Sequence, residues 1–215
     1  MTTLKLYWQD AYLKSFKAKI IKIDGHKVWL DKTCFYPESG GQCGDKGLLQ
    51  GQCVIDTKLD ADKDIIHILE ETPKFQVGEE ILGEINWERR HKIMRVHSAS
   101  HIMEHFLIKV FGPLKLLGSN LNELRDSSTY FSEEPLEVGK LKTVEELSNI
   151  FIKKNLPIIT FFDETKPNFR IWQCDEIQIP CGGTHPLNTE EIGQIQLKRE
   201  KGGKNKEKVI TTLLS

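Results

Sequence analysis

Two short segments, each with two histidine or cysteine side chains four positions apart, constrain this fold most strongly. The first is Arg95-Val96-His97-Ser98-Ala99-Ser100-His101, and the second is Cys181-Gly182-Gly183-Thr184-His185. Histidines four positions apart lie on one face of a helix, about one turn from each other, which suits a shared metal ion. The two glycines of the second segment favour a tight loop. One ion bound by both pairs requires a fold that brings the two segments together.

The donor types predict which metal such a site would hold. One thiolate and three imidazoles favour zinc over magnesium or calcium. A single histidine pair on a helix is more often structural, so the match between two pairs carries the prediction. The predicted zinc set is His97, His101, Cys181 and His185.

A competing pattern overlaps the first histidine pair. The segment His101-Ile102-Met103-Glu104-His105 matches the H-x-x-E-H motif of inverted zinc proteases. That alternative leaves His97 and the Cys181/His185 pair without a role, and the sequence shows no second acidic helix for the missing ligand. We therefore expect His105 to pack against the helix and Glu104 to be a surface carboxylate or one behind the ligands.

Composition is that of an ordinary soluble protein, with 215 residues, 39% hydrophobic and 28% charged. This length can hold one large domain or two small ones. The sequence contains no run of about 18 apolar residues and no apolar block typical of a signal peptide. Five cysteines are an odd number without the density of a disulfide scaffold. We expect a cytoplasmic protein with free or metal-bound thiols and no membrane contact, and we favour a monomer.

The net charge of −1 argues against indiscriminate coating of nucleic acid, but two local clusters are basic. Taken alone, each cluster is most simply a solvated surface. The first cluster consists of Arg89, Arg90, Lys92 and Arg95, and the second includes Lys201, Lys204, Lys206 and Lys208.

The first 86 residues predict a β-rich domain that resembles a small barrel. Residues 18–23 lead through Asp24-Gly25 into residues 27–30, which is a strong hairpin signal. Further short strands are expected near residues 51–56, 64–69 and 79–85.

Residues 87–215 predict an α+β domain that contains the zinc site. A long helix is expected between an N-cap at Asn86 and a stop at Gly112-Pro113. The capping box Thr143-x-x-Glu146 predicts the start of a second helix. Strands are expected at residues 128–131, 158–162 and 169–172, and residues 193–198 and 208–213 predict a hairpin. The predicted fold class is therefore α+β, with a β-barrel-like domain followed by the zinc-containing domain.

A glycine-rich segment, residues 33–47, adds a third motif. It contains Phe35-Tyr36-Pro37-Glu38-Ser39-Gly40-Gly41-Gln42, which composition alone also allows as a simple turn. Followed by H-x-x-x-H and Cys-Gly-Gly-Thr-His, this segment is similar to the editing domain of alanyl-tRNA synthetase. The chain has no room for an aminoacylation domain. It therefore resembles, over nearly its whole length, free-standing alanyl-tRNA editing proteins of the AlaX type that keep the N-terminal glycine-rich domain. Ser39 and Pro186 are mild departures from the family pattern.

The resemblance implies a trans-acting hydrolase that deacylates alanine tRNA mischarged with serine or glycine. It makes the two pairs above the zinc ligands, with zinc either activating water or orienting the substrate. It suggests Thr33 as the side chain that recognises the serine hydroxyl and Gln42 as the one that positions the ester or water. On this interpretation the two basic clusters contact tRNA phosphates.

Two alternatives remain open at this stage. Threonyl-tRNA synthetase editing domains share a similar ligand pattern, so the chain could deacylate mischarged threonine tRNA. The chain could also be a non-catalytic tRNA-binding module with a structural zinc, since four protein ligands close a zinc site and three leave a position for water.

Overall fold

The structure is a computed structural model that describes residues 3–166 and 169–214. The chain forms two compact units, which we describe separately. The first comprises Met1–Ser39 and Cys43–His91, and the second comprises Gly40–Gln42 and Lys92–Ser215. Three residues of the glycine-rich segment therefore belong to the second unit. The sequence-based division after residue 86 stays a prediction.

The first unit is built around a closed barrel with strand order β2-β3-β7-β6-β5-β8. Every neighbouring pair in this barrel is antiparallel. The strands are β2 (Ser15–Asp24), β3 (Lys27–Leu30), β5 (Gly47–Leu49), β6 (Gln52–Leu59), β7 (Ile65–Leu69) and β8 (Glu80–Ile85). The predicted hairpin is confirmed, since Asp24 pairs with Lys27 and Gly25 has a φ of 56°. Outside the barrel, β1 (Leu4–Lys5) pairs in parallel with β4 (Lys32–Thr33), and Leu6–Trp8 forms a short 3₁₀ helix.

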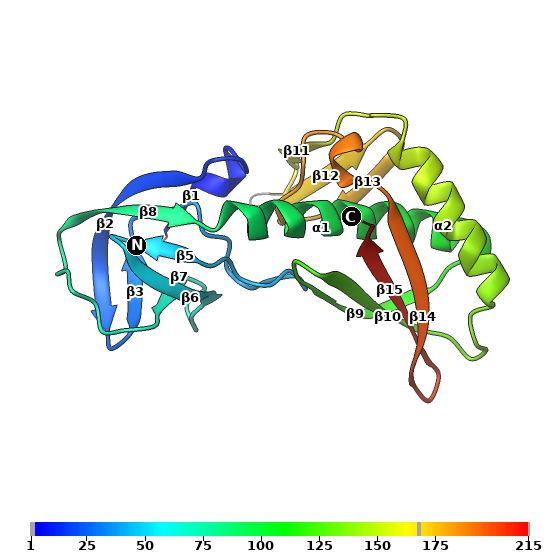
Figure 1. Cartoon of the computed structure of the whole chain (residues 1–215), viewed down its shortest axis with the longest axis horizontal. Coiled ribbons are helices and arrows are strands. Elements are labelled where there is room, and N and C mark those ends of the chain that lie inside the picture. Colours follow the sequence, from blue (N-terminus) through cyan, green and yellow to red (C-terminus); the bar gives the residue numbers. More distant parts are fainter. Residues whose placement is uncertain (1–2, 167–168, 215) are drawn as a thin grey trace. The chain divides into compact units, whose positions relative to one another are not determined.

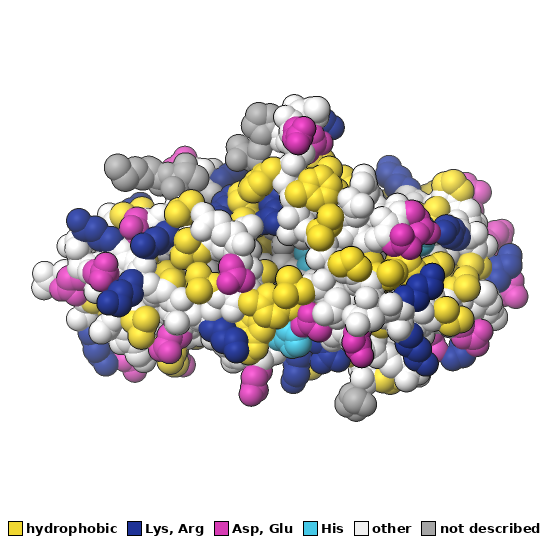
Figure 2. Space-filling model, turned by 90° about the horizontal axis from the view of Figure 1, so that it is seen from above, with side chains coloured by type: hydrophobic (Ala, Val, Ile, Leu, Met, Phe, Trp, Pro, Cys, Tyr) yellow, Lys and Arg dark blue, Asp and Glu magenta, His cyan; other side chains and the backbone are white. Residues whose placement is uncertain are grey.

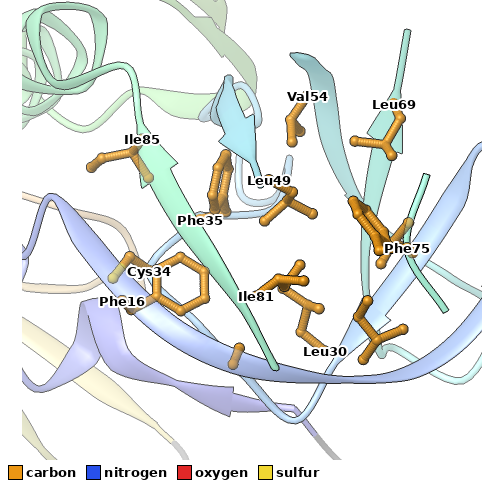
Figure 3. Close-up of a cluster of buried hydrophobic side chains, with 13 residues drawn as sticks. Phe16, Leu30, Cys34, Phe35, Leu49, Val54, Leu69, Phe75, Ile81 and Ile85 are labelled. Carbon is orange, nitrogen blue, oxygen red and sulfur yellow. The ribbon is translucent and has the colours of Figure 1, made fainter. Parts of the chain in front are cut away.

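The barrel interior is filled by apolar side chains from successive strands. Along β2, Phe16, Ala18 and Ile20 are buried and the residues between them are exposed, as expected when alternate side chains point to opposite faces. Figure 3 shows Phe16, Leu30, Leu49, Ile81 and their labelled neighbours converging on this core. The barrel therefore has a hydrophobic core of its own.

The second unit combines two helices with two antiparallel sheets (Figure 1). The helices are α1 (Trp87–Phe111), whose first turns belong to the first unit, and α2 (Val138–Ile152). One sheet has the order β14-β15-β10-β9, with β9 (Lys115–Leu121), β10 (Arg125–Phe131), β14 (Ile195–Gly203) and β15 (Lys206–Leu213). The other sheet consists of β11 (Ile159–Phe162), β12 (Arg170–Cys174) and β13 (Ile177–Pro180), and Glu190–Ile192 forms a second 3₁₀ helix. The α+β class is confirmed.

The long helix follows its sequence signals closely. Asn86 caps α1, because its side-chain oxygen accepts the amide hydrogen of Arg89 at 3.1 Å. The helix ends one residue before Gly112, which has a φ of 85°. Ile93, Val96 and Met103 recur at intervals of three and seven positions along α1, and all three are completely buried. Local sequence therefore determines the start and the end of the helix that carries His97 and His101.

Two local predictions were wrong or incomplete. Helix α2 begins at Val138, five positions before the predicted capping box, because the preceding turn buries Leu141 and tertiary packing extends the helix. Thr143 lies inside the helix, where its hydroxyl donates to the carbonyl of Gly139 at 3.4 Å. Strand β9 has no counterpart among the predicted strands, although β10 pairs with it throughout.

Candidate metal centre

The two predicted ligand pairs meet within the second unit. His97 and His101 come from successive turns of α1, and Cys181 and His185 come from the loop that follows β13. One donor atom from each of the four side chains lies within 4.8 Å of the others. Residues 84 positions apart in sequence, such as His97 and Cys181, are therefore brought into a single cluster.

The two printed distances from the Cys181 sulfur match those around a tetrahedral zinc ion. Sγ of Cys181 lies 3.5 Å from Nε2 of His97 and 3.3 Å from Nε2 of His185. A zinc ion bound to a thiolate at 2.3 Å and an imidazole at about 2.0 Å holds those two atoms about 3.5 Å apart. In addition, Nε2 of His101 is shielded from solvent and has no hydrogen-bond partner among the described residues. The residues present therefore fit a zinc ion.

Gln42 fixes the protonation of His97. The side-chain oxygen of Gln42 accepts the backbone amide hydrogen of Thr184 at 3.2 Å and lies 2.9 Å from Nδ1 of His97. A carboxamide oxygen only accepts hydrogen bonds, so Nδ1 of His97 carries the proton. The lone pair of the ring is thereby left on Nε2, the nitrogen that faces Cys181. The carboxamide nitrogen of Gln42 donates to the hydroxyl of Thr184 at 3.0 Å, so both ends of the side chain are held.

Ser98 contacts the ring of His185 at the nitrogen that faces away from Cys181. Its hydroxyl oxygen lies 2.9 Å from Nδ1 of His185 and accepts the indole N–H of Trp172 at 3.3 Å. Both contacts lie in the interior, where Ser98 and Trp172 are completely buried. The two side chains were not identified from the sequence, since a helical serine and a strand tryptophan carry no metal-binding signal.

The surroundings keep the imidazoles neutral. Burial lowers the pKa of His97 to about 4, and burial followed by the other histidines lowers the pKa of His185 well below its usual range. Burial raises the pKa of the Cys181 thiol to about 11, opposed by the amide of Gly183 and the charge of Arg170. Neutral imidazole is the form that binds metal, so three of the four candidate ligands have the protonation state for coordination at neutral pH.

The second glycine of the Cys-Gly-Gly-Thr-His loop is required by close packing. A Cβ atom on Gly183 would lie 2.3 Å from Cε1 of His97 and 2.8 Å from the side-chain oxygen of Gln42. Only glycine lets the loop approach α1 this closely.

Thr33 lies in the first unit, at the end of β4, and is completely buried. Its hydroxyl lies 2.8 Å from Nε2 of His67, whose Nδ1 is 3.1 Å from the carbonyl of Val28. Because that carbonyl only accepts, Nδ1 of His67 carries the proton and Nε2 accepts the hydroxyl hydrogen of Thr33. The amide of Phe35 donates to the same hydroxyl oxygen at 3.0 Å. One lone pair of Thr33 is left for a further donor.

The four residues of the first basic cluster differ in their exposure to solvent. Arg90 is completely buried, pairs with Asp45 and donates to the carbonyl of Cys34, so it has no surface to offer a phosphate. We therefore correct the prediction that included it. Arg89 is half-buried and donates to the carbonyl of Gly44 at 2.8 Å.

The remaining basic residues lie in the second unit. Lys92 is exposed, and Arg95 is half-buried with its Nε donating to the carbonyl of Ile192 at 3.1 Å. The second cluster occupies the β14–β15 hairpin, whose turn extends past the end of β10 (Figure 1). Lys201, Lys204 and Lys206 are exposed there, and Lys208 is partly exposed. Figure 2 shows acidic and basic side chains interspersed over the face in view, in keeping with the low net charge.

The protease-like motif does not assemble a site of its own. His105 contacts the ring of Phe106 and lies 3.9 Å from the carboxylate of Glu176, while the four-residue donor cluster contains neither His105 nor Glu104. His97, which the protease alternative leaves unused, lies at the centre of the hydrogen bonds described above.

Comparison with known proteins identifies the family. The alanyl-tRNA editing protein AlaX-M of Pyrococcus horikoshii is 34% identical over 212 residues, covering 96% of each chain. The chain belongs to the alanyl-tRNA editing protein family. A second member of this family, AlaX-M of Saccharolobus solfataricus, is 31% identical over 98% of this chain and 99% of its own length. The family model for class II (A) tRNA synthetases matches residues 8–89.

This chain is also similar to a part of a larger enzyme. The alanine–tRNA ligase of Saccharolobus islandicus is 33% identical over 222 residues, which are 91% of this chain and 25% of the ligase. The chain thus spans about a quarter of the ligase and nearly all of an AlaX-M protein. No helix among residues 3–166 and 169–214 is long and apolar enough to span a membrane.

Proposed function

We propose that this protein is a trans-acting aminoacyl-tRNA deacylase that hydrolyses the ester of alanine tRNA mischarged with serine or glycine. The observation that carries the proposal is the cluster of His97, His101, Cys181 and His185, in a chain that matches AlaX-M proteins over 96% of its length. The oriented Gln42 beside this cluster supports an active site.

The chemistry of the cluster suits ester hydrolysis. A zinc ion held by these residues would supply a Lewis acid for the ester or an acidified water. Gln42 would hold the imidazole ring of His97 in one orientation, because hydrogen bonds fix both ends of the Gln42 carboxamide. Burial of the ligands excludes bulk water, which strengthens electrostatic interactions in the site.

Selection against serine has a physical basis. An apolar pocket shaped for alanine cannot strongly reject an added hydroxyl, so a second site must recognise that hydroxyl directly. We propose Thr33 for this role, from the family resemblance. With its proton donated to His67, Thr33 would accept the hydrogen of the serine hydroxyl.

Contacts with tRNA are proposed for the exposed basic residues. Lys92, Lys201, Lys204 and Lys206 are exposed, whereas Arg89, Arg95 and Lys208 are partly exposed and would contribute less. Such contacts set affinity and its salt dependence rather than specificity.

The decisive experiment measures hydrolysis of alanine tRNA charged with serine, glycine or alanine, with and without a zinc chelator. Rapid chelator-sensitive loss of serine or glycine, with alanine retained, is expected. Binding of tRNA without hydrolysis would instead indicate a binding module with structural zinc. Faster hydrolysis of mischarged threonine tRNA would indicate the threonyl alternative.

A variant of Cys181 tests whether deacylation depends on the cluster of three histidines and one cysteine. Cys181→Ala is expected to lose bound zinc and deacylation while keeping much of the tRNA affinity, because the metal centre and the basic residues act separately. Cys53→Ala is the control, since Cys53 is exposed and free. Unchanged turnover in Cys181→Ala would refute the site assignment.

A further inference from the structure

Asp126, in β10, is a buried carboxylate with no role in the proposed chemistry. It is completely buried, and its Oδ2 accepts the hydroxyls of Ser100 at 2.8 Å and Ser128 at 2.7 Å, while Oδ1 accepts that of Ser119. A buried carboxylate is costly unless hydrogen bonds compensate it. Here the three donors come from three different elements, α1, β9 and β10, which Asp126 therefore joins.

Two of these donors adjoin the metal centre. Ser100 directly precedes the ligand His101 on α1. Ser119 lies against Gly41, where an added Cβ atom would be 3.0 Å from the carbonyl oxygen of Ser119 and 3.2 Å from its hydroxyl oxygen. Gly41 also has a φ of 89°, a conformation that favours glycine. The glycine-rich segment thus packs closely against the serine whose hydroxyl Asp126 accepts.

The same approach places Gln42. The amide of Leu121 donates to the carbonyl of Gly41 at 2.8 Å, and Gln42 forms a parallel bridge with Leu121. Gly40–Gln42 therefore adds to the free edge of β9, beside Ser119. The carboxamide of Gln42 then reaches His97 and Thr184.

We propose that Asp126, acting through Ser119, is a positioning residue that sets where the Gln42 carboxamide meets His97. This inference deepens the proposed function and rests on it for its activity readout. Asp126 holds the β9 edge at the place where the glycine-rich segment docks, and it ties that edge to the helix of the histidine ligands.

The structure supplies a matched pair of variants for the test. Ser119→Ala and Ser128→Ala each remove one hydroxyl hydrogen bond to the same carboxylate, but only Ser119 contacts Gly41. Ser119→Ala is expected to lower kcat on serine-charged alanine tRNA about 10-fold with KM little changed, in line with lost support behind a metal ligand. Ser128→Ala should keep kcat within about two-fold of the wild-type value. Its melting temperature should fall by about as much as that of Ser119→Ala, because each variant loses one hydrogen bond to Asp126. Equal losses of kcat in the two variants would overturn the proposal.

A double-mutant cycle tests the route through Gln42. If Ser119 acts by positioning Gln42, the Ser119→Ala change should add little to the loss already caused by Gln42→Met. Multiplication of the two losses would show that Ser119 acts independently of Gln42, contrary to the proposal.

A spectroscopic readout separates this proposal from the proposed function. In the zinc-loaded protein, Ser119→Ala should shift the NMR resonances of the Gln42 side-chain amide, while Ser128→Ala should leave them in place. Gly41→Ala, which crowds the same contact, should shift them as well. Unshifted Gln42 resonances in both Ser119→Ala and Gly41→Ala would refute the positioning role. This measurement holds even for a wild type that hydrolyses no mischarged tRNA.

Discussion

The side-chain oxygen of Gln42 lies 2.9 Å from Nδ1 of His97, 55 positions later in the chain. The same oxygen accepts the amide of Thr184, which directly precedes the ligand His185. One side chain therefore touches both segments that supply the candidate metal ligands. The glycine-rich segment therefore supports the candidate metal centre through the side chain of Gln42.

Replacement of Gln42 by methionine keeps the length of the side chain and removes its hydrogen bonds. We expect kcat/KM for serine-charged alanine tRNA to fall about 10–100-fold and zinc affinity to weaken, because His97 loses the acceptor that fixes its tautomer. Steady-state deacylation and a zinc competition titration measure the two effects. Gln194→Met, at an exposed position, serves as the control. Full activity and full zinc affinity in Gln42→Met would contradict the role assigned to Gln42.

A methyl group on Gly183 should disturb the metal centre directly. The added Cβ would lie 2.3 Å from Cε1 of His97, far inside van der Waals contact, so the ring or the loop must move. We expect Gly183→Ala to bind zinc at least about 10-fold more weakly. Gly118→Ala is matched to it, since nothing lies within 4 Å of its added Cβ. Equal zinc affinity in the two variants would show that the loop adapts freely.

Removal of the Thr33 hydroxyl separates recognition from structure. If Thr33 reads the serine hydroxyl, Thr33→Val should slow hydrolysis of serine-charged tRNA and spare the glycine-charged one. The variant also leaves Nε2 of the buried His67 without its donor, which should cost about 1–3 kcal/mol of stability. Parallel kinetics on both substrates, with thermal unfolding, test the two effects. Equal loss on both substrates would assign Thr33 a structural role only.

The stability of the barrel should depend on pH through His67. Burial lowers the pKa of His67 to about 4 from 6.5, so below pH 6.5 the unfolded chain binds a proton that the folded barrel excludes. The contribution is complete above pH 6.5 and is lost as the pH falls towards 4, by up to about 3 kcal/mol. Chemical unfolding of the wild type and of His67→Gln between pH 7 and pH 4 checks this. Wild-type stability should fall more steeply than that of the variant, and parallel curves would contradict the assignment.

Local sequence patterns predicted the elements that their own residues determine. Histidines four positions apart share a helix face, Asn86 caps α1, and Asp24-Gly25 closes the first hairpin. Capping, turn formation and helical spacing act between residues that are close in sequence, so these features can be recognised without the fold. The predicted start of α2 was wrong because burial of Leu141 outweighed the capping box at Thr143.

The sequence by itself determined the types of the candidate ligands, their spacing and the helix that carries the first pair. Tertiary structure alone decided that Ser98 and Trp172 support His185, that Gln42 docks on the edge of β9, and that Arg90 is buried on Asp45. The physical reason is that a buried polar group must find its partner wherever the fold supplies one. Gln42 and Thr184, for example, are 142 positions apart. Such pairings depend on which surfaces the two sheets and α1 bury, and no local pattern encodes them.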